Sequence, residues 1–187
     1  MNSSSHLVRA VRGFTLVEFL AVVAIAGILA AVAVPSMIRF VKSVRLTSAT
    51  NDLFASFLMA RSEAAKRNSR VVLCKSGDGA TCARTGGWEQ GWLVFHDSNS
   101  SGSRDSGEEI VLRGQALAAD LRLTGNLNVA RYISYAPSGE TRLASGAFQA
   151  GTITLCNHST QQAEARQIIV SSSGRPRVQR TRLDQCA

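Results

Sequence analysis

The chain has 187 residues, a formal net charge of +8 and four cysteines, and 45% of its residues are hydrophobic. This length allows one compact domain beside an anchor. The sequence has no internal repeat and no compositionally simple stretch, which excludes a repeat protein and a disordered chain. It also has no serine, histidine and acid set, no phosphate loop and no metal-type cluster, so we expect neither an enzyme nor a cofactor.

The first predicted element is an apolar stretch that contains one acid. From Phe14 to Val34 there are 21 residues, and Glu18 is their one ionisable side chain. A helix of about 20 residues crosses a bilayer. A charged side chain at the bilayer centre costs about 3 kcal/mol on insertion scales, so Glu18 is expected to have a partner. Cleavage after Gly13 would supply one, because it would create an amine on Phe14.

The residues around this point match a known signal. Gly13-Phe14-Thr15-Leu16-Val17-Glu18, followed by Ala30-Ala31-Val32-Ala33-Val34-Pro35, closely resembles the class III signal of type IV prepilins and type II secretion pseudopilins. The resemblance implies cleavage by a prepilin peptidase between Gly13 and Phe14 and N-methylation of Phe14. It also implies that Glu18 neutralises the N-terminal amine of a neighbouring pilin in the filament.

The rest of the chain predicts a helix followed by strands. One helix is expected from about Thr15 to about Arg67, since apolar residues recur at steps of three and four in its second half: Ile38, Val41, Val44, Leu53, Phe57, Ala60 and Ala64. Short β-type runs separated by turn residues follow, at 70–74, 91–96, 109–113, 130–136, 151–156, 167–171 and 177–180.

The expected fold is therefore α+β and pilin-like, with a transmembrane half-helix and an amphipathic half-helix packed on antiparallel β-sheet. Its parts are a leader (1–13), a transmembrane and filament-core helix (14–35) and a globular domain (36–187) that ends in a basic tail (174–187). Basic residues before the span place the leader in the cytoplasm. We expect one pass through the inner membrane with a periplasmic domain, and then a place at the tip of a type IV pilus on the cell surface.

All four cysteines lie beyond the span, in the part expected to be oxidised. An even count predicts two disulfides with three connectivities. We expect each cysteine to pair with its neighbour in the sequence, which joins Cys74 to Cys82 and Cys156 to Cys186. The second bridge would enclose 29 residues, restrict the unfolded chain by about 3 to 4 kcal/mol, and hold the C-terminal tail. A zinc site is a poor alternative, because no cysteine pair has metal-type spacing.

One loop imitates a calcium site. Its acidic and polar residues have the spacing of an EF-hand loop: Asp97, Asn99, Ser101, Gly102, Asp105 and Glu108. The runs on either side look like strands, however, whereas an EF-hand needs two helices. We therefore favour a polar hairpin connection and keep calcium as a weak alternative.

The basic residues gather at the C-terminal end. Without the leader the chain has 19 basic and 13 acidic residues. Between Gly174 and Ala187 there are four arginines and one acid: Arg175, Arg177, Arg180, Arg182 and Asp184. Residues two apart on a strand point to the same side, so Arg175 and Arg177 would share one face and Arg180 and Arg182 another. This density of arginine indicates a surface that binds nucleic acid. Basic residues on an edge strand are also a common protection against aggregation.

The segment Ser171-Ser172-Ser173-Gly174-Arg175-Pro176-Arg177 resembles the C-terminal Gly-Arg-x-Arg motif of FimT-type members of the GspH/FimT family of minor pilins. The resemblance implies that Gly174, Arg175 and Arg177 contribute to nonspecific binding of extracellular double-stranded DNA for uptake in natural transformation. Two alternatives remain. A FimU-like minor pilin, or a GspH-like pseudopilin of type II secretion, would prime or cap a filament without binding DNA.

Overall fold

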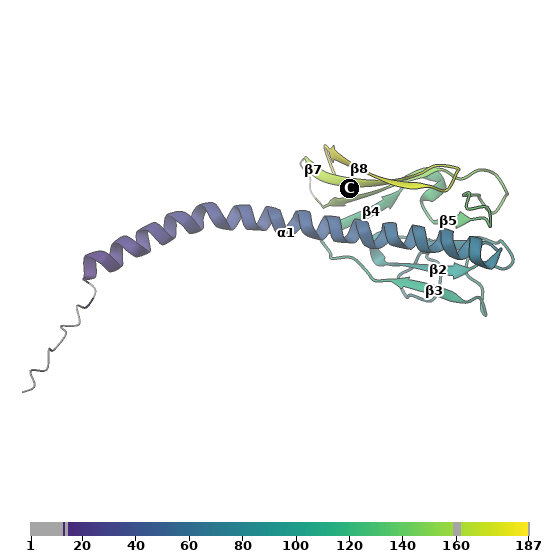
Figure 1. Cartoon of the computed structure of the whole chain (residues 1–187), viewed down its shortest axis with the longest axis horizontal. Coiled ribbons are helices and arrows are strands. Elements are labelled where there is room, and N and C mark those ends of the chain that lie inside the picture. The colour runs from purple at the N-terminus through teal and green to yellow at the C-terminus, as the bar shows by residue number, and fades with distance from the viewer. Residues whose placement is uncertain (1–12, 14, 159–161, 187) are drawn as a thin grey trace, which may run out of the picture. The chain divides into compact units, whose positions relative to one another are not determined.

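The structure is a computed structural model that describes residues 13, 15–158 and 162–186 (Figure 1). These residues form one long helix, α1, two short 3-10 helices and eight strands. The chain divides into two compact units, the first ending at Val41 and the second beginning at Lys42.

The first unit contains the apolar part of helix α1, Leu16–Arg67. The described side chains up to Val41 are exposed, and between Glu18 and Arg39 none of them is charged. Here the helix is long and apolar enough to cross a membrane. The helix continues through Pro35, although proline has no amide hydrogen to donate to the preceding turn.

Helix α1 ends in a left-handed turn. Asn68 adopts a φ of 48°, a conformation that asparagine tolerates better than most residues. The amides of Asn68 and Ser69 donate to the carbonyls of Ala65 and Ala64 at 3.3 and 3.2 Å. This is the Schellman arrangement, which satisfies carbonyls that the end of a helix would otherwise leave without partners.

In the second unit α1 buries a stripe of side chains at steps of three and four residues: Leu46, Ala49, Leu53, Phe57, Ala60 and Ala64. The sequence pattern also placed Ile38, Val41 and Val44 on this stripe, but their side chains are 53%, 39% and 50% exposed. Leu46, which was not predicted, is fully buried. Residues two apart lie on different sides of a helix. The buried side therefore begins at Leu46.

The first sheet is antiparallel, with the strand order β3-β2-β1-β5. Its strands are β1 (Val71–Lys75), β2 (Trp92–His96), β3 (Ile110–Gly114) and β5 (Tyr132–Tyr135). All five residues of β1 are buried, because Val71 and Leu73 face the main core while Val72 and Cys74 face a second cluster on the other side of the sheet. Burial on both faces explains the continuous apolar runs of β1 and β2.

The second sheet is also antiparallel, with the order β4-β6-β7-β8. Its strands are β4 (Leu121–Gly125), β6 (Gly151–Asn157), β7 (Ala163–Val170) and β8 (Pro176–Leu183). Strand β8 pairs with β7 along its whole length and, among the residues that the structure describes, no further strand pairs with its other side. The C-terminal strand is therefore an edge strand.

Both sheets pack on the second half of α1. Figure 1 shows β7 and β8 on one side of the helix and β2 and β3 on the other, and apolar side chains from both sheets join the helix stripe in one core. Two buried indoles also connect the layers. Trp88, in the 3-10 helix η1 (Trp88–Gln90), donates to the Val129 carbonyl at 3.1 Å, and Trp92 donates to the Ser56 hydroxyl of α1 at 2.9 Å.

The predicted fold class is confirmed: a long N-terminal helix packs on antiparallel sheets. Two details differ. Strand β4 was not predicted, because Leu121-Arg122-Leu123-Thr124 is short and its two apolar residues are leucines, which are not among the residues enriched in strands. Strands β7 and β8 are each longer than predicted, since their pairing extends over residues 163–170 and 176–183. Neither of the two 3-10 helices, Trp88–Gln90 and η2 (Leu127–Val129), was predicted.

The helix stripe gives a first prediction. Phe57 is fully buried, whereas its neighbour Leu58 is 46% exposed. Phe57→Ala should lower the free energy of unfolding by about 3 to 5 kcal/mol, because it removes apolar contacts and leaves a cavity. Leu58→Ala should lower it by less than about 1 kcal/mol.

Denaturant unfolding of the full chain in maltoside micelles, followed by the fluorescence of Trp88 and Trp92, measures both variants. Equal losses of stability in the two variants would contradict the assigned orientation of α1.

Candidate functional site

A glycine turn positions the C-terminal arginine strand. Gly174 is buried and has a φ of 72°, and a Cβ at this position would collide with the backbone carbonyl of Gly139. The turn is closed by a hydrogen bond from the Gly174 amide to the Ser171 carbonyl at 2.9 Å, and the Thr141 amide donates to the Ser172 carbonyl at 3.1 Å. Glycine is thus required both for backbone conformation and for space.

Strand β8 exposes arginines on both faces. Arg175, Arg177, Arg180 and Arg182 are all exposed. In the register with β7, Arg177 lies opposite Ile169, while Arg180 and Arg182 lie opposite Arg166 and Glu164. Side chains alternate along a strand, so Arg177 is on one face of the sheet and Arg180 and Arg182 are on the other.

None of these four arginines forms an ion pair with any residue that the structure describes. Their guanidinium groups therefore keep their donors available to an external anion. Because Arg177 also lies on an edge strand, a large anionic partner could approach it without displacing another element. Planar guanidinium groups suit the oxygens of phosphate well.

A disulfide fixes the far end of β8. Cys186 is bonded to Cys156 of β6, with a Cα–Cα distance of 5.9 Å. Both cysteines are buried in a small cluster with Ala163, Ala165 and Leu183. Since β6 is two strands away from β8 in the sheet, the bridge attaches the end of the tail across β7.

The second disulfide closes a polar loop. Cys74 is bonded to Cys82, with a Cα–Cα distance of 5.7 Å. Inside the loop the Asp78 carboxylate accepts hydrogen bonds from the Thr81 hydroxyl at 2.6 Å and from the Ala80 and Thr81 amides at 2.8 Å. The Thr81 hydroxyl, these amides and the Ser76 hydroxyl lower the pKa of Asp78 well below its usual range.

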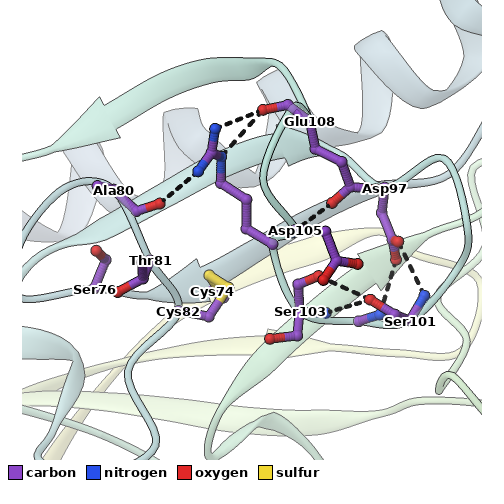
Figure 2. The surroundings of a disulfide bond; sticks show 12 residues. Cys74, Ser76, Ala80, Thr81, Cys82, Asp97, Ser101, Ser103, Asp105 and Glu108 are labelled. Carbon is purple, nitrogen blue, oxygen red and sulfur yellow. Dashed lines mark hydrogen bonds between the residues drawn. A yellow bond between two sulfur atoms is a disulfide. The ribbon is translucent and has the colours of Figure 1, made fainter.

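The loop from Asp97 to Glu108 uses its carboxylates to hold its own backbone (Figure 2). Asp97 is fully buried and accepts from the amides of Ser101 at 3.0 Å and Gly102 at 2.9 Å. Glu108 accepts from the Ser98 amide at 2.8 Å and the Asp105 amide at 3.0 Å. Burial raises the pKa of Asp97, and its two amide hydrogen bonds oppose this shift.

The other residues of the calcium candidate are also engaged. The side-chain amide of Asn99 donates to the Asp105 carboxylate at 2.8 Å. The guanidinium of Arg104 donates to the carbonyls of Glu108 at 2.8 Å and Ala80 at 2.9 Å, which joins this loop to the neighbouring disulfide loop. Within the described residues no three histidine, cysteine or acidic side chains gather as metal ligands. The arrangement is that of a hydrogen-bonded connection between β2 and β3.

At the other end of the protein, Glu18 lies in a capping box. Its carboxylate accepts from the Thr15 amide at 2.9 Å and from the Thr15 hydroxyl at 3.0 Å, while its own amide donates to that hydroxyl at 3.3 Å. The spacing Thr-x-x-Glu is the sequence signal for this motif. Gly13 is exposed, and the predicted processing residue Phe14 lies outside the described residues.

Comparison with known families agrees with this architecture. The family described as Type II transport protein GspH matches residues 49–174, about two thirds of the chain. The chain belongs to the GspH family. The Prokaryotic N-terminal methylation motif matches residues 8–34. A search of curated proteins finds no significant match.

Solved structures of minor pilins share the fold. Two crystal structures of the type IV minor pilin FimU from Pseudomonas aeruginosa match with TM-scores of 0.56 and 0.53 and identities of 19% and 18%. They cover 79% and 76% of this chain and 99% and 100% of FimU. The minor pseudopilin EpsH from the Type 2 Secretion System of Vibrio cholerae matches with a TM-score of 0.44 and 15% identity, over 71% of this chain and 94% of EpsH.

The predicted resemblance to GspH/FimT-like minor pilins is thereby confirmed. Family membership and the methylation motif imply processing by a prepilin peptidase and assembly with other pilins. The apolar part of α1 fits an inner-membrane anchor of a pilin that later enters the pilus.

One residue of functional interest escaped the sequence reasoning. Arg166 is a buried arginine of β7 that lies opposite Arg180. The alternation of Arg166, Ile168 and Val170 places the arginine on the apolar face of its strand. That signal could have identified Arg166, had the strand been predicted to begin before residue 167.

The disulfide loop gives a prediction about pH. Asp78 should titrate with a midpoint below the ordinary value of about 3.9, because its hydrogen bonds favour the carboxylate. Since the folded pKa is depressed, the stabilisation by Asp78 is present above the unfolded pKa and is lost as the pH falls through the folded pKa. Carbon-13 NMR of the Asp78 carboxyl group between pH 6 and pH 2 measures the midpoint.

Thr81→Val should raise this midpoint towards the ordinary value, because the Thr81 hydroxyl makes the largest contribution to the shift. Thr85→Val is the control, since Thr85 is exposed and its hydroxyl makes no hydrogen bond to Asp78 among the described residues. An unshifted midpoint in the Thr81 variant would contradict the assigned hydrogen bonds.

Proposed function

We propose that this minor pilin binds extracellular double-stranded DNA without sequence preference, for uptake in natural transformation, and has no catalytic role. The observation that supports this most is the set of exposed arginines on and beside edge strand β8: Arg175, Arg177, Arg180 and Arg182. They form no ion pair in the described part of the chain, and Gly174 and the Cys156–Cys186 bridge fix the two ends of the strand.

Arg175 and Arg177 are the principal ligands in this proposal. Contacts between guanidinium groups and phosphate oxygens carry no sequence information, so binding is nonspecific and weakens steeply with salt. No aromatic residue occurs between residues 149 and 187. Proteins that hold single strands stack bases on aromatic side chains, and duplex DNA is therefore the better ligand for this surface.

The N-terminal residues have roles in assembly. A prepilin peptidase cleaves the chain between Gly13 and Phe14 and so removes residues 1–13. Phe14 is then methylated on its amine. Residues 14–35 form the transmembrane and filament-core helix, and residues 36–187 form the exposed globular domain. In the filament Glu18 pairs with the N-terminal amine of a neighbouring pilin. The subunit sits at or near the pilus tip, where its basic tail (174–187) meets DNA.

DNA binding by the arginine tail can be measured directly. A soluble fragment that begins at Lys42 should bind random-sequence duplex DNA with a dissociation constant on the order of 1 to 100 μM at physiological salt. Arg175→Ala with Arg177→Ala should weaken binding about tenfold or more. It should also lower the slope of log affinity against log salt by about 2, because two phosphate contacts are lost.

The matched control is Arg84→Ala with Arg131→Ala, which removes the same charge from exposed positions outside the second sheet. This control should change affinity much less than the tail variant. Equal effects of the two double variants would mean that net charge, and not the tail, determines binding, and the proposed site would be wrong.

A structural role in starting or capping a filament is the second candidate. It is favoured by the fold shared with the type IV minor pilin FimU and by exposed apolar residues on the second half of α1, among them Leu58 and Met59. Such residues suit contacts between pilins.

The two roles predict different phenotypes. If the tail is a DNA receptor, cells carrying the Arg175→Ala and Arg177→Ala variant should make wild-type numbers of pili but lose transformation. If the protein acts only in assembly through this tail, the same cells should lose pili and transformation together. Electron microscopy of pili and transformation frequency separate the two outcomes.

A further inference from the structure

A polar cleft lies on the helix side of the second sheet, in the unit that begins at Lys42. Its volume is about 330 Å³, and it is lined by Ser43 of α1, Glu164 and Arg166 of β7, and Arg180, Thr181 and Arg182 of β8. Arg177 is not part of it, because Arg177 extends from the other face of the sheet. The cleft is therefore separate from the Arg175 and Arg177 surface.

The deepest charged group in the cleft has no carboxylate partner. Arg166 is only 6% exposed, and the one hydrogen bond that it makes among the described residues joins its Nη1 to the carbonyl of Ala165 at 3.3 Å. No acidic side chain of the chain, all of which lie in the described part, forms an ion pair with it. A buried cation is costly unless an anion compensates it.

The neighbouring charges further favour an anion in the cleft. Arg180 lies directly opposite Arg166 in the register of β7 and β8, a like-charge pair that destabilises a sheet. Arg182 lies on the same face, opposite Glu164. The lining of the cleft thus includes three arginines but one acid, and Ser43 of α1 also lines it.

We infer that this cleft binds a phosphate group, either as inorganic phosphate or as a phosphate ester. A carboxylate has one charge and two oxygens, which one guanidinium can saturate in a bidentate pair. A tetrahedral phosphate has more oxygens and up to two charges, so it can accept hydrogen bonds from three arginines at once. The volume of the cleft leaves room for the first atoms of an ester beside the phosphate.

Binding of phosphate to the full chain in maltoside micelles tests the inference. Phosphorus NMR and calorimetry at constant ionic strength should show saturable binding at one site per chain. Arg166→Gln should weaken this binding at least tenfold, because it removes the buried charge. Glu164→Gln should tighten binding severalfold, because it removes the one negative charge in the cleft.

Two further variants keep the outcome decisive. If Arg166→Gln fails to fold, as judged by the fluorescence of Trp88 and Trp92, then Glu164→Gln and Arg180→Gln carry the test at exposed positions. Arg175→Ala with Arg177→Ala should leave phosphate binding unchanged. This result distinguishes the cleft from the proposed DNA surface, since that variant should lose DNA and keep phosphate.

The source of the phosphate is identified by comparing inorganic phosphate with short-chain phosphatidylglycerol, each with and without Arg166→Gln. Tighter binding of the lipid, dependent on Arg166, would identify a headgroup, and tighter binding of inorganic phosphate would identify a soluble ligand. The inference is overturned if the wild type binds neither saturably, or if Glu164→Gln and Arg166→Gln both fold and leave binding unchanged.

Discussion

The burial of one stripe of α1 against two sheets is the contact on which the globular unit depends. The stripe from Leu46 to Ala64 supplies the helix side of the single large core, and side chains of both sheets complete it. The two sheets are not continuous with each other. The helix, the shared apolar core and hydrogen bonds such as those of Trp88, Trp92 and Thr141 join the layers. The positions of β7 and β8, and hence of every arginine discussed above, follow from this packing.

The arginines of edge strand β8 can protect the edge against pairing with other chains and can also bind anions. An exposed edge offers unpaired backbone groups to other chains, and charged side chains are a common protection against such pairing. Arginine satisfies that requirement and also provides donors for phosphate. The two faces of the strand then differ in chemistry. Arg177 is exposed and lies opposite Ile169, whereas Arg180 and Arg182 line an open polar cleft together with the buried Arg166.

Sequence reasoning reached the fold class because its signals are local and periodic. The apolar run after Gly13, the helical steps of Leu53, Phe57, Ala60 and Ala64, and the turn residues between strands each indicate one element without knowledge of the others. The end of α1 at Arg67 also follows from a local signal, since Asn68 can adopt the left-handed conformation.

The features that the sequence did not predict depend on tertiary contacts. Val44 and Leu46 are both apolar, and only the packing of the sheets decides that Leu46 is the buried one. The close approach of Gly174 to the Gly139 carbonyl depends on a turn elsewhere in the chain, which the hydrogen bond from Thr141 to Ser172 joins to this segment. The meeting of Arg166 with Arg180 depends on the register of β7 and β8, which no spacing in the chain encodes.

The bridge from Cys186 to Cys156 has a mechanical consequence. If β8 holds DNA as proposed, a pull on the DNA places the strand under tension, and an edge strand is hydrogen-bonded to a neighbouring strand on one side only. Strand β8 is hydrogen-bonded to β7 over eight residue pairs, and its C-terminal end is covalently attached to β6. Force applied at its arginines is therefore shared among three strands, and peeling from the C-terminal end would first require a covalent bond to break.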